Sequence, residues 1–272
     1  MSGPITNYNY TSSGPITVSQ SSVSERTAFI AKVYGLVFLG IIVFFASAIL
    51  PTIGMFLGIP VLSQIGYTMA TLPVFVPLLL IIASSFIVHF IERIPVINVI
   101  GLFGLATMWG LLTVNMIAYA CIQFAPAGAI VPGQPVDPSV LGPGLAIVLQ
   151  AAIITFVAFG ALTAYVMITK QDFSFLRGFL FVGMIIVMVA IVGALIFSMI
   201  GSPTIMGIDF NVFHFALSVV ITLLMVGYIL YDTSNVIHHY PTTMVVAAAL
   251  ALMVDFIILF RQILFFLINS RR

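Results

Sequence analysis

The fold of this protein is decided by runs such as GFLFVGMIIVMVAIVGALIFSMI, which covers residues 178–200 and contains no charged side chain. A helix of about 20 apolar residues crosses the hydrocarbon core of a membrane, so this run is long enough to span it. The rest of the chain is similar: of 272 residues, 62% are hydrophobic and only 6% are charged, with a formal net charge of +1. This composition excludes a soluble globular protein, a disordered chain and a basic nucleic-acid-binding protein. The sequence therefore predicts an integral membrane protein.

Uncharged segments separated by proline, glycine or charged residues predict seven transmembrane helices. The first uncharged stretch is too long for one span, and we divide it between Pro51 and Pro60. We expect an all-α, polytopic protein with one transmembrane domain over residues 28–272, preceded by a flexible polar tail over residues 1–27. The predicted spans cover residues 28–50, 72–91, 96–123, 144–168, 178–200, 210–236 and 243–268.

The distribution of basic residues predicts the orientation of the chain. Arg26 and Lys32 lie at the N-terminal side of the first span, Arg93 lies in the second loop, and Lys170 and Arg177 lie in the fourth loop. The first, third and fifth loops contain no Lys or Arg. The positive-inside rule then places the N-terminus in the cytoplasm. Seven spans put the C-terminus, which ends in Arg271 and Arg272, on the other side. Either the early helices dominate or the last segment does not cross fully, and we favour the first. With no secretory signal at the start, a bacterial inner membrane is expected.

Two acidic residues have no interfacial explanation. Asp232 lies in the last turns of the sixth predicted span, and Asp255 lies near the middle of the seventh. An aspartate at the bilayer centre costs about 2.5–3.5 kcal/mol on insertion scales, so such a residue suggests a function. A short turn joins the two spans, which are therefore expected to be antiparallel neighbours. Two close carboxylates in a dry site would share a proton and, when ionised, would offer oxygen ligands suited to Ca²⁺. Buried structural aspartates, or aspartates paired with arginine, remain the alternative.

The other charged and aromatic residues are explained by their positions. Lys32 and Arg261 lie within predicted spans but have stems long enough to carry their charge to the interface. His238 and His239 flank the last turn and are expected to form a solvated interfacial pair. Trp109 is expected to face lipid or the protein core.

Three runs together resemble the Bax inhibitor family, also called the transmembrane Bax-inhibitor-motif family, in its bacterial branch. They are YILYDTSNVIHH (residues 228–239), AAALALMVDFIILF (247–260) and TKQDFSFL (169–176). The resemblance implies seven helices with helix seven in the centre, and a pH-sensitive Ca²⁺ leak across the membrane. The family's paired aspartates fall on Asp232 and Asp255, and its latch arginine falls near Arg93. Its helix-seven pattern Leu-Tyr-Leu-Asp reads Leu252-Met253-Val254-Asp255 here, so the tyrosine hydroxyl is absent.

Three functions are compatible with these features. The first is a pH-sensitive cation leak gated by Asp232 and Asp255, with Ca²⁺ as the transported ion. The second is a regulatory protein, surrounded by membrane lipid, that binds a partner such as a membrane-bound AAA protease or a cell-death factor. An intramembrane aspartyl protease is less favoured, because the Gly-x-Gly-Asp pattern is missing before Asp255. We therefore expect no enzymatic activity and no nucleic-acid partner. With Cys121 as the single cysteine and no Cys/His cluster at zinc-ligand spacing, we also expect no cofactor.

Overall fold

The computed structural model describes residues 17–72, 76, 80, 97–131, 134–201, 204–205 and 207–271. Within them, six helical segments are long and apolar enough to cross a membrane, with α4 and α5 counted as one segment. The predicted second span, 72–91, lies almost entirely outside the described residues. In chain order the elements are η1 (Val18–Gln20), α1 (Val23–Leu57), α2 (Pro60–Ala70), α4 (Ile97–Leu111), α5 (Val114–Gln123), α6 (Pro138–Thr169), α7 (Leu176–Met199), β1 (Thr204–Ile205), β2 (Ile208–Asp209), α8 (Phe210–His238) and α9 (Val245–Asn269).

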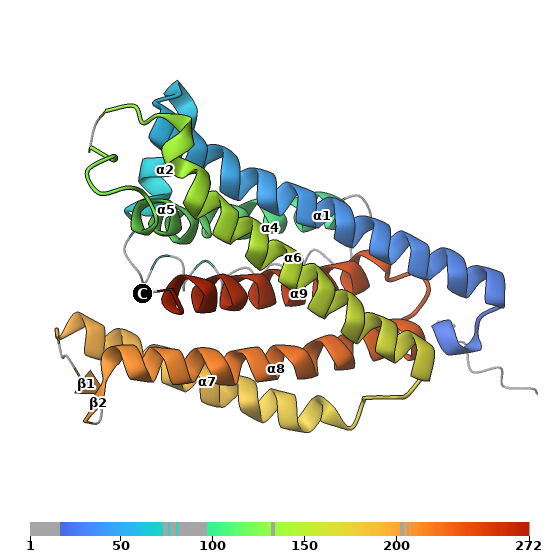
Figure 1. Cartoon of the computed structure of the whole chain (residues 1–272). Helices are drawn as coiled ribbons and strands as arrows, with labels where there is room; N and C mark the ends of the chain where they lie inside the picture. Colours follow the sequence, from blue (N-terminus) through green and yellow to red (C-terminus); the bar gives the residue numbers. More distant parts are fainter. Residues whose placement is uncertain are drawn as a thin grey trace, which may run out of the picture.

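Helix α9 runs through the middle of the bundle (Figure 1). It contacts α1, α4, α6 and α8, while α7 lies outside α8. Aromatic side chains hold it in place: the Phe260 ring packs edge-on against Phe44 of α1 at 5.7 Å, and Phe256 packs against Phe159 of α6 at 5.6 Å between ring centroids. Interlocking rings of this kind favour one fixed arrangement of the helices. The central position predicted for the seventh helix is confirmed.

The first described residues are tied to the turn between α8 and α9. The Val18 N–H donates to the Tyr240 carbonyl at 3.0 Å, and Thr17 forms an antiparallel bridge with Pro241. Helix α1 then begins with a capping box, in which the Ser22 hydroxyl accepts from the Glu25 N–H and the Glu25 carboxylate accepts from the Ser22 N–H. The tail predicted to continue to residue 27 is therefore structured from Thr17 onward.

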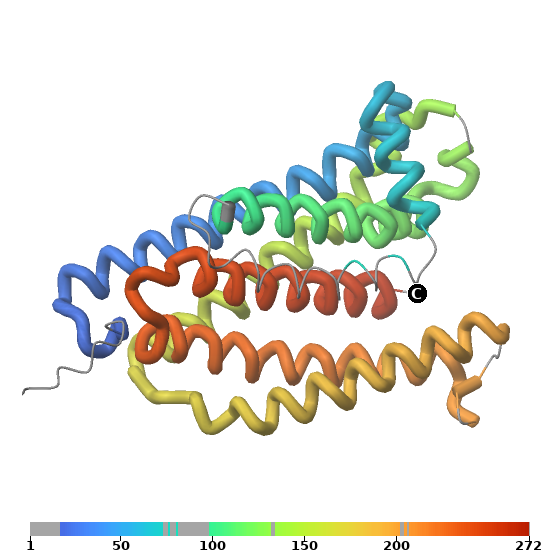
Figure 2. The backbone as a smooth tube through the Cα atoms, turned by 180° about the vertical axis from the view of Figure 1, so that it is seen from behind, coloured from blue at the N-terminus to red at the C-terminus, as the bar shows by residue number. Residues whose placement is uncertain are grey.

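The two ends of the described chain lie at opposite ends of the bundle. Figures 1 and 2 show α9 running in the same direction as α1, so that the C-terminus lies far from η1. The last helix runs through the bundle and is long and apolar enough to cross a membrane, as the favoured interpretation requires.

Several helix boundaries differ from the predicted ones because proline does not interrupt these helices. Helix α1 continues through Pro51 and ends only at Gly58, whose φ of 68° suits glycine. A proline within a membrane helix is tolerated when neighbouring groups compensate for the lost hydrogen bond. Helix α6 begins at Pro138 rather than at residue 144, because proline is favourable in the first turn and Asp137 caps it by accepting from the Ser139 N–H at 2.8 Å.

The third predicted span, 96–123, is interrupted rather than continuous. Helix α4 ends at Leu111 and α5 begins at Val114, and the Thr113 N–H bonds to the Gly110 carbonyl in a tighter turn. A break of this kind leaves backbone carbonyl groups without helical partners in the middle of a membrane span. These groups must be satisfied by side chains from elsewhere in the bundle.

Candidate functional site

Asp255 lies in the interior of the central helix. Its side chain is only 4% exposed, and its neighbours Leu252 and Phe256 are fully buried. Among the described residues, its Oδ2 atom has no hydrogen-bond partner. A buried carboxyl oxygen without a partner is costly, which keeps Asp255 a candidate for a functional role.

Asp232, on α8, lies beside Asp255. Both side chains line one cavity of about 250 Å³, and the two carboxyl groups interact electrostatically there. The antiparallel packing of α8 and α9 thus brings the two membrane aspartates together, and their role stays a prediction.

The rest of the aspartate cavity is almost entirely apolar. Tyr228 is the one other described residue in its lining with a hydroxyl group, and that hydroxyl donates outward to the Leu180 carbonyl of α7 at 3.1 Å. Trp109 of α4 is 6% exposed, so it belongs to the core rather than to the lipid-facing surface. In such surroundings, charge on the pair is poorly screened. The remaining described lining residues are Leu105, Met184, Met225, Leu250, Ala251, Val254 and Ile258.

The aspartate pair offers few ligands to a metal ion. Within the described ranges, no group of three or more His, Cys, Asp or Glu side chains is placed to hold one. Ca²⁺ takes six to eight oxygen ligands, so a Ca²⁺ ion between Asp232 and Asp255 would need most of its ligands from water.

The predicted latch, Arg93, lies outside the described residues. Arg261 lies within them and does not extend to the interface as predicted. Its guanidinium donates to the Leu112 carbonyl and to the Thr113 hydroxyl, each at 3.2 Å, and its Cζ atom lies 5.8 Å from the centroid of the Trp109 ring. No sequence pattern signals this contact, because the partner groups become available only through the break between α4 and α5.

A polar cluster joins the loop between α6 and α7 to the end of α8. His239 pairs with Asp172 at 3.0 Å, and the Ser234 hydroxyl accepts from the Phe173 N–H at 2.9 Å. The Ser174 N–H and the neighbouring His239 lower the pKa of Asp172 to about 2. The cluster fixes the end of the helix that carries Asp232.

Comparison with known proteins places this site within a shared region. The family described as inhibitor of apoptosis-promoting Bax1 matches residues 135–272, a range that includes α6 to α9 and both aspartates. An uncharacterized protein of Campylobacter jejuni is 30% identical over 91% of this chain and 92% of its own length.

Two relatives with informative names match shorter regions. Bax inhibitor 1 of Schizosaccharomyces pombe is 39% identical over 43% of this chain and 41% of its own length. The modulator of FtsH protease YccA of Escherichia coli is 33% identical over 31% of this chain and 33% of its own length. The chain thus spans less than half the length of these two relatives.

Proposed function

Because the chain belongs to the Bax inhibitor family, we propose that it is a regulatory protein of a bacterial inner membrane that acts on a membrane-bound AAA protease. The observation that carries this proposal is the relationship to an inner-membrane protein named as a modulator of FtsH protease. The names of the relatives denote inhibition or modulation rather than catalysis. A protein of this kind acts by binding, and its partner must reach it within or beside the membrane.

Helix α7 offers a suitable face for a partner helix. It packs chiefly on α8, and its outer side chains are exposed: Phe181 by 65%, Ile185 by 48% and Val189 by 68%. A membrane helix that packs on few of the described helices of its own bundle offers a surface for packing against another protein.

Crosslinking combined with a degradation assay tests this proposal. A photoreactive residue at Val189 of α7 should capture the protease in membranes, whereas the same group at the equally exposed Val157 of α6 should capture only lipid. In proteoliposomes with purified FtsH, the protein should slow degradation of a membrane substrate severalfold. The proposal requires this slowing to survive Asp232→Asn and Asp255→Asn. If the membrane substrate is degraded equally fast with and without the protein, the proposal is wrong. If deletion of residues 1–16 abolishes the slowing of degradation, the protease binds the N-terminal tail rather than α7.

The aspartate cavity favours a second function, a pH-sensitive cation leak with Ca²⁺ as the transported ion. Two neighbouring carboxyl groups in an apolar cavity share a proton at low pH, since double ionisation is disfavoured. In that state the hydrogen-bonded pair joins α8 to α9 and carries a single negative charge, so it attracts a cation less strongly than the doubly ionised pair. Loss of the shared proton creates two negative charges that attract a cation and repel each other. Conduction should therefore increase as pH rises.

Ion flux into liposomes separates this function from the first. Ca²⁺ entry should rise with pH for the parent protein, and Asp232→Asn or Asp255→Asn should remove both the pH dependence and most of the flux. Asp209→Asn is the matched control, because Asp209 caps α8 at its exposed end and asparagine caps a helix equally well. If the Asp232→Asn and Asp255→Asn variants both conduct Ca²⁺ like the parent protein at every pH, the leak does not pass through this pair.

A further inference from the structure

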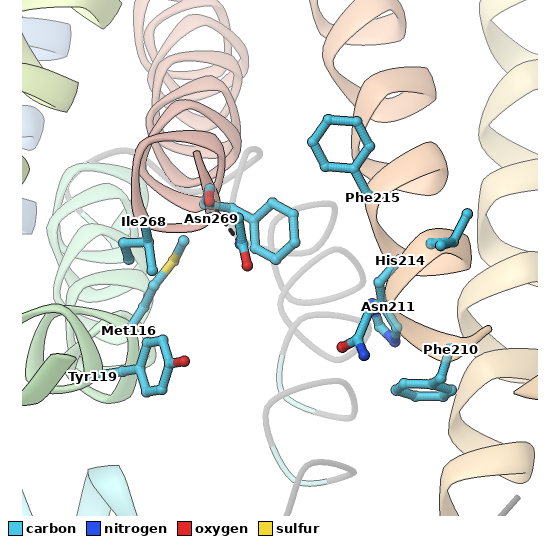
Figure 3. Close-up of a pocket in the computed structure, with 10 residues that line it drawn as sticks. Met116, Tyr119, Phe210, Asn211, His214, Phe215, Ile268 and Asn269 are labelled. Atoms are coloured by element: carbon cyan, nitrogen blue, oxygen red, sulfur yellow. Dashed lines mark hydrogen bonds between the residues drawn. The ribbon is translucent and has the colours of Figure 1, made fainter. Parts of the chain in front are cut away.

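Two adjoining cavities open at the end of the bundle where the C-terminus lies. They measure about 590 and 430 Å³ and share four lining residues, so we treat them as one hollow, the distal vestibule. Figure 3 shows Met116 and Tyr119 of α5 and Asn269 of α9 facing Asn211 and His214 of α8 across it. Further polar side chains line its deeper part, namely Ser198, Ser218, Arg261 and Gln262. A hollow with so many polar groups inside a membrane bundle is suited to hold water.

The distal vestibule and the aspartate cavity follow each other along the same helices. On α8, Ile221 lines the vestibule and Met225, one turn further, lines the aspartate cavity. On α9, Arg261 lines the vestibule and Ile258 lines the aspartate cavity. One helical turn rises about 5.4 Å, so a single layer of side chains separates the two hollows.

Arg261 and Trp109 form the polar part of this layer. Trp109 lines the aspartate cavity on one side, and the guanidinium of Arg261 lies against its ring and faces the vestibule on the other. The guanidinium is held there by the Leu112 carbonyl and the Thr113 hydroxyl. No acidic side chain in the described part of the chain lies within ion-pair distance of it. An arginine kept inside a membrane span with no counter-charge among the described residues is a costly arrangement that indicates a role.

We propose that Arg261, held against Trp109 at the break between α4 and α5, is the barrier that closes the distal vestibule from the aspartate cavity. Its side chain fills the passage, and its positive charge repels cations that enter the vestibule. The break is what makes the barrier movable, since the Leu112 carbonyl and the Thr113 hydroxyl both lie between the two helices and can release the guanidinium without unwinding α4 or α5. The barrier lies on the route needed by the proposed cation leak, but it concerns access of water and solutes and does not depend on which ion is conducted.

Labelling of introduced cysteines tests the barrier directly. Cys121 is the single cysteine of the chain, so a Cys121→Ala protein provides an unreactive background. Ser218→Cys reports on the vestibule and Ala251→Cys on the aspartate cavity. A charged, membrane-impermeant methanethiosulfonate reagent is added only on the side where the vestibule opens. The vestibule cysteine should react, and the cavity cysteine should stay unmodified.

Removal of the barrier should expose the aspartate cavity. Arg261→Gln should raise the labelling rate of Ala251→Cys at least tenfold and leave that of Ser218→Cys unchanged, which also shows that the protein has folded. Thr113→Val removes one of the two groups that hold Arg261 while keeping its volume, and should give a smaller increase. Gln262→Ala is the matched control, because Gln262 also lines the vestibule but makes none of these contacts, and it should leave the cavity closed.

Two results would overturn the proposal. Rapid labelling of Ala251→Cys while Arg261 is present would show that no barrier lies between the hollows. Unchanged protection in both Arg261→Gln and Thr113→Val, with normal labelling of Ser218→Cys, would show that other residues close the passage. A protein that conducts no ions would disprove the leak and yet give the same labelling pattern, so the two failures are distinguishable.

Discussion

Asp172 is the residue through which the loop between α6 and α7 is fixed to α8. It accepts a hydrogen bond from the Ser174 N–H at 2.9 Å and pairs with His239 at 3.0 Å. These contacts favour the ionised carboxylate and lower its pKa from the ordinary 3.8 to about 2. Folding therefore gains from an ionised Asp172, and the gain is small because the pair is largely exposed.

The sign of the pH effect follows from this lowered pKa. The stabilisation is complete above about pH 4, where the unfolded chain is also ionised, and disappears as pH falls towards about 2. Asp172→Asn should therefore lower the melting temperature in detergent at pH 7, by an amount equivalent to about 1 kcal/mol or less. The difference between variant and parent should vanish as pH approaches 2. Circular dichroism melts of both proteins across this range measure it, and a difference that grows on acidification would contradict it.

The residues of the candidate site were predictable from the sequence to different degrees. Asp232 and Asp255 stand out because charges are so rare in the chain that each one within a span requires a reason. Arg261 does not stand out, since an arginine seven residues before the end of a predicted span can be explained by extension to the interface. Its actual partners are a backbone carbonyl and a hydroxyl group at the break between α4 and α5, which no pattern within its own helix indicates.

At the scale of elements, the contact between α5 and α6 depends on one glycine. Gly144 of α6 lies against the backbone of α5, and a Cβ atom there would overlap Cys121 and lie 2.9 Å from the Ala120 carbonyl oxygen. Backbone atoms cannot move aside as the end of a side chain can. Small residues at such positions allow membrane helices to approach closely.

Gly144→Ala should therefore destabilise the protein by about 1–3 kcal/mol. Gly142→Ala, on the same helix two residues earlier, is the matched control because a Cβ atom added there would meet nothing within 4 Å, and it should be neutral or slightly stabilising. Thermal unfolding in detergent compares the two variants. Equal melting temperatures for Gly144→Ala and Gly142→Ala would mean that α5 and α6 do not approach each other as closely as this contact requires.

The helices themselves were largely predictable, whereas their interruptions were not. Long apolar runs indicated the positions of α6 to α9 within a few residues. The break after Leu111 could not be foreseen, because no proline or charge marks it and apolar residues continue on both sides. The short helix α2 and the two-residue strands β1 and β2 also fall in segments that the pattern identifies only as loops.

At the scale of the whole molecule, α1 and α9 run in the same direction, and the two ends of the described chain lie at opposite ends of the bundle (Figure 1). The basic residues beside the first predicted span and in the second and fourth predicted loops predict that the η1 end faces the cytoplasm and the C-terminal end the other side. An alkaline phosphatase fused after residue 272 should therefore be active in bacterial cells, and a green fluorescent protein fused there should be dark. A phosphatase inserted in the loop between α6 and α7 is the control and should be inactive. The reverse pattern would invert the orientation of the entire bundle.

The backbone hydrogen bond between Val18 and Tyr240 has a consequence for the order in which the protein is synthesised and assembled. A ribosome delivers Val18 to the membrane long before it synthesises Tyr240, so the start of α1 has no docking site during most of translation. The η1 segment can close onto the bundle only after α8 has entered the bilayer and the chain has turned at Pro241. Burial of Val18, which is complete in the finished protein, is therefore among the last steps of assembly and marks a chain whose insertion has succeeded.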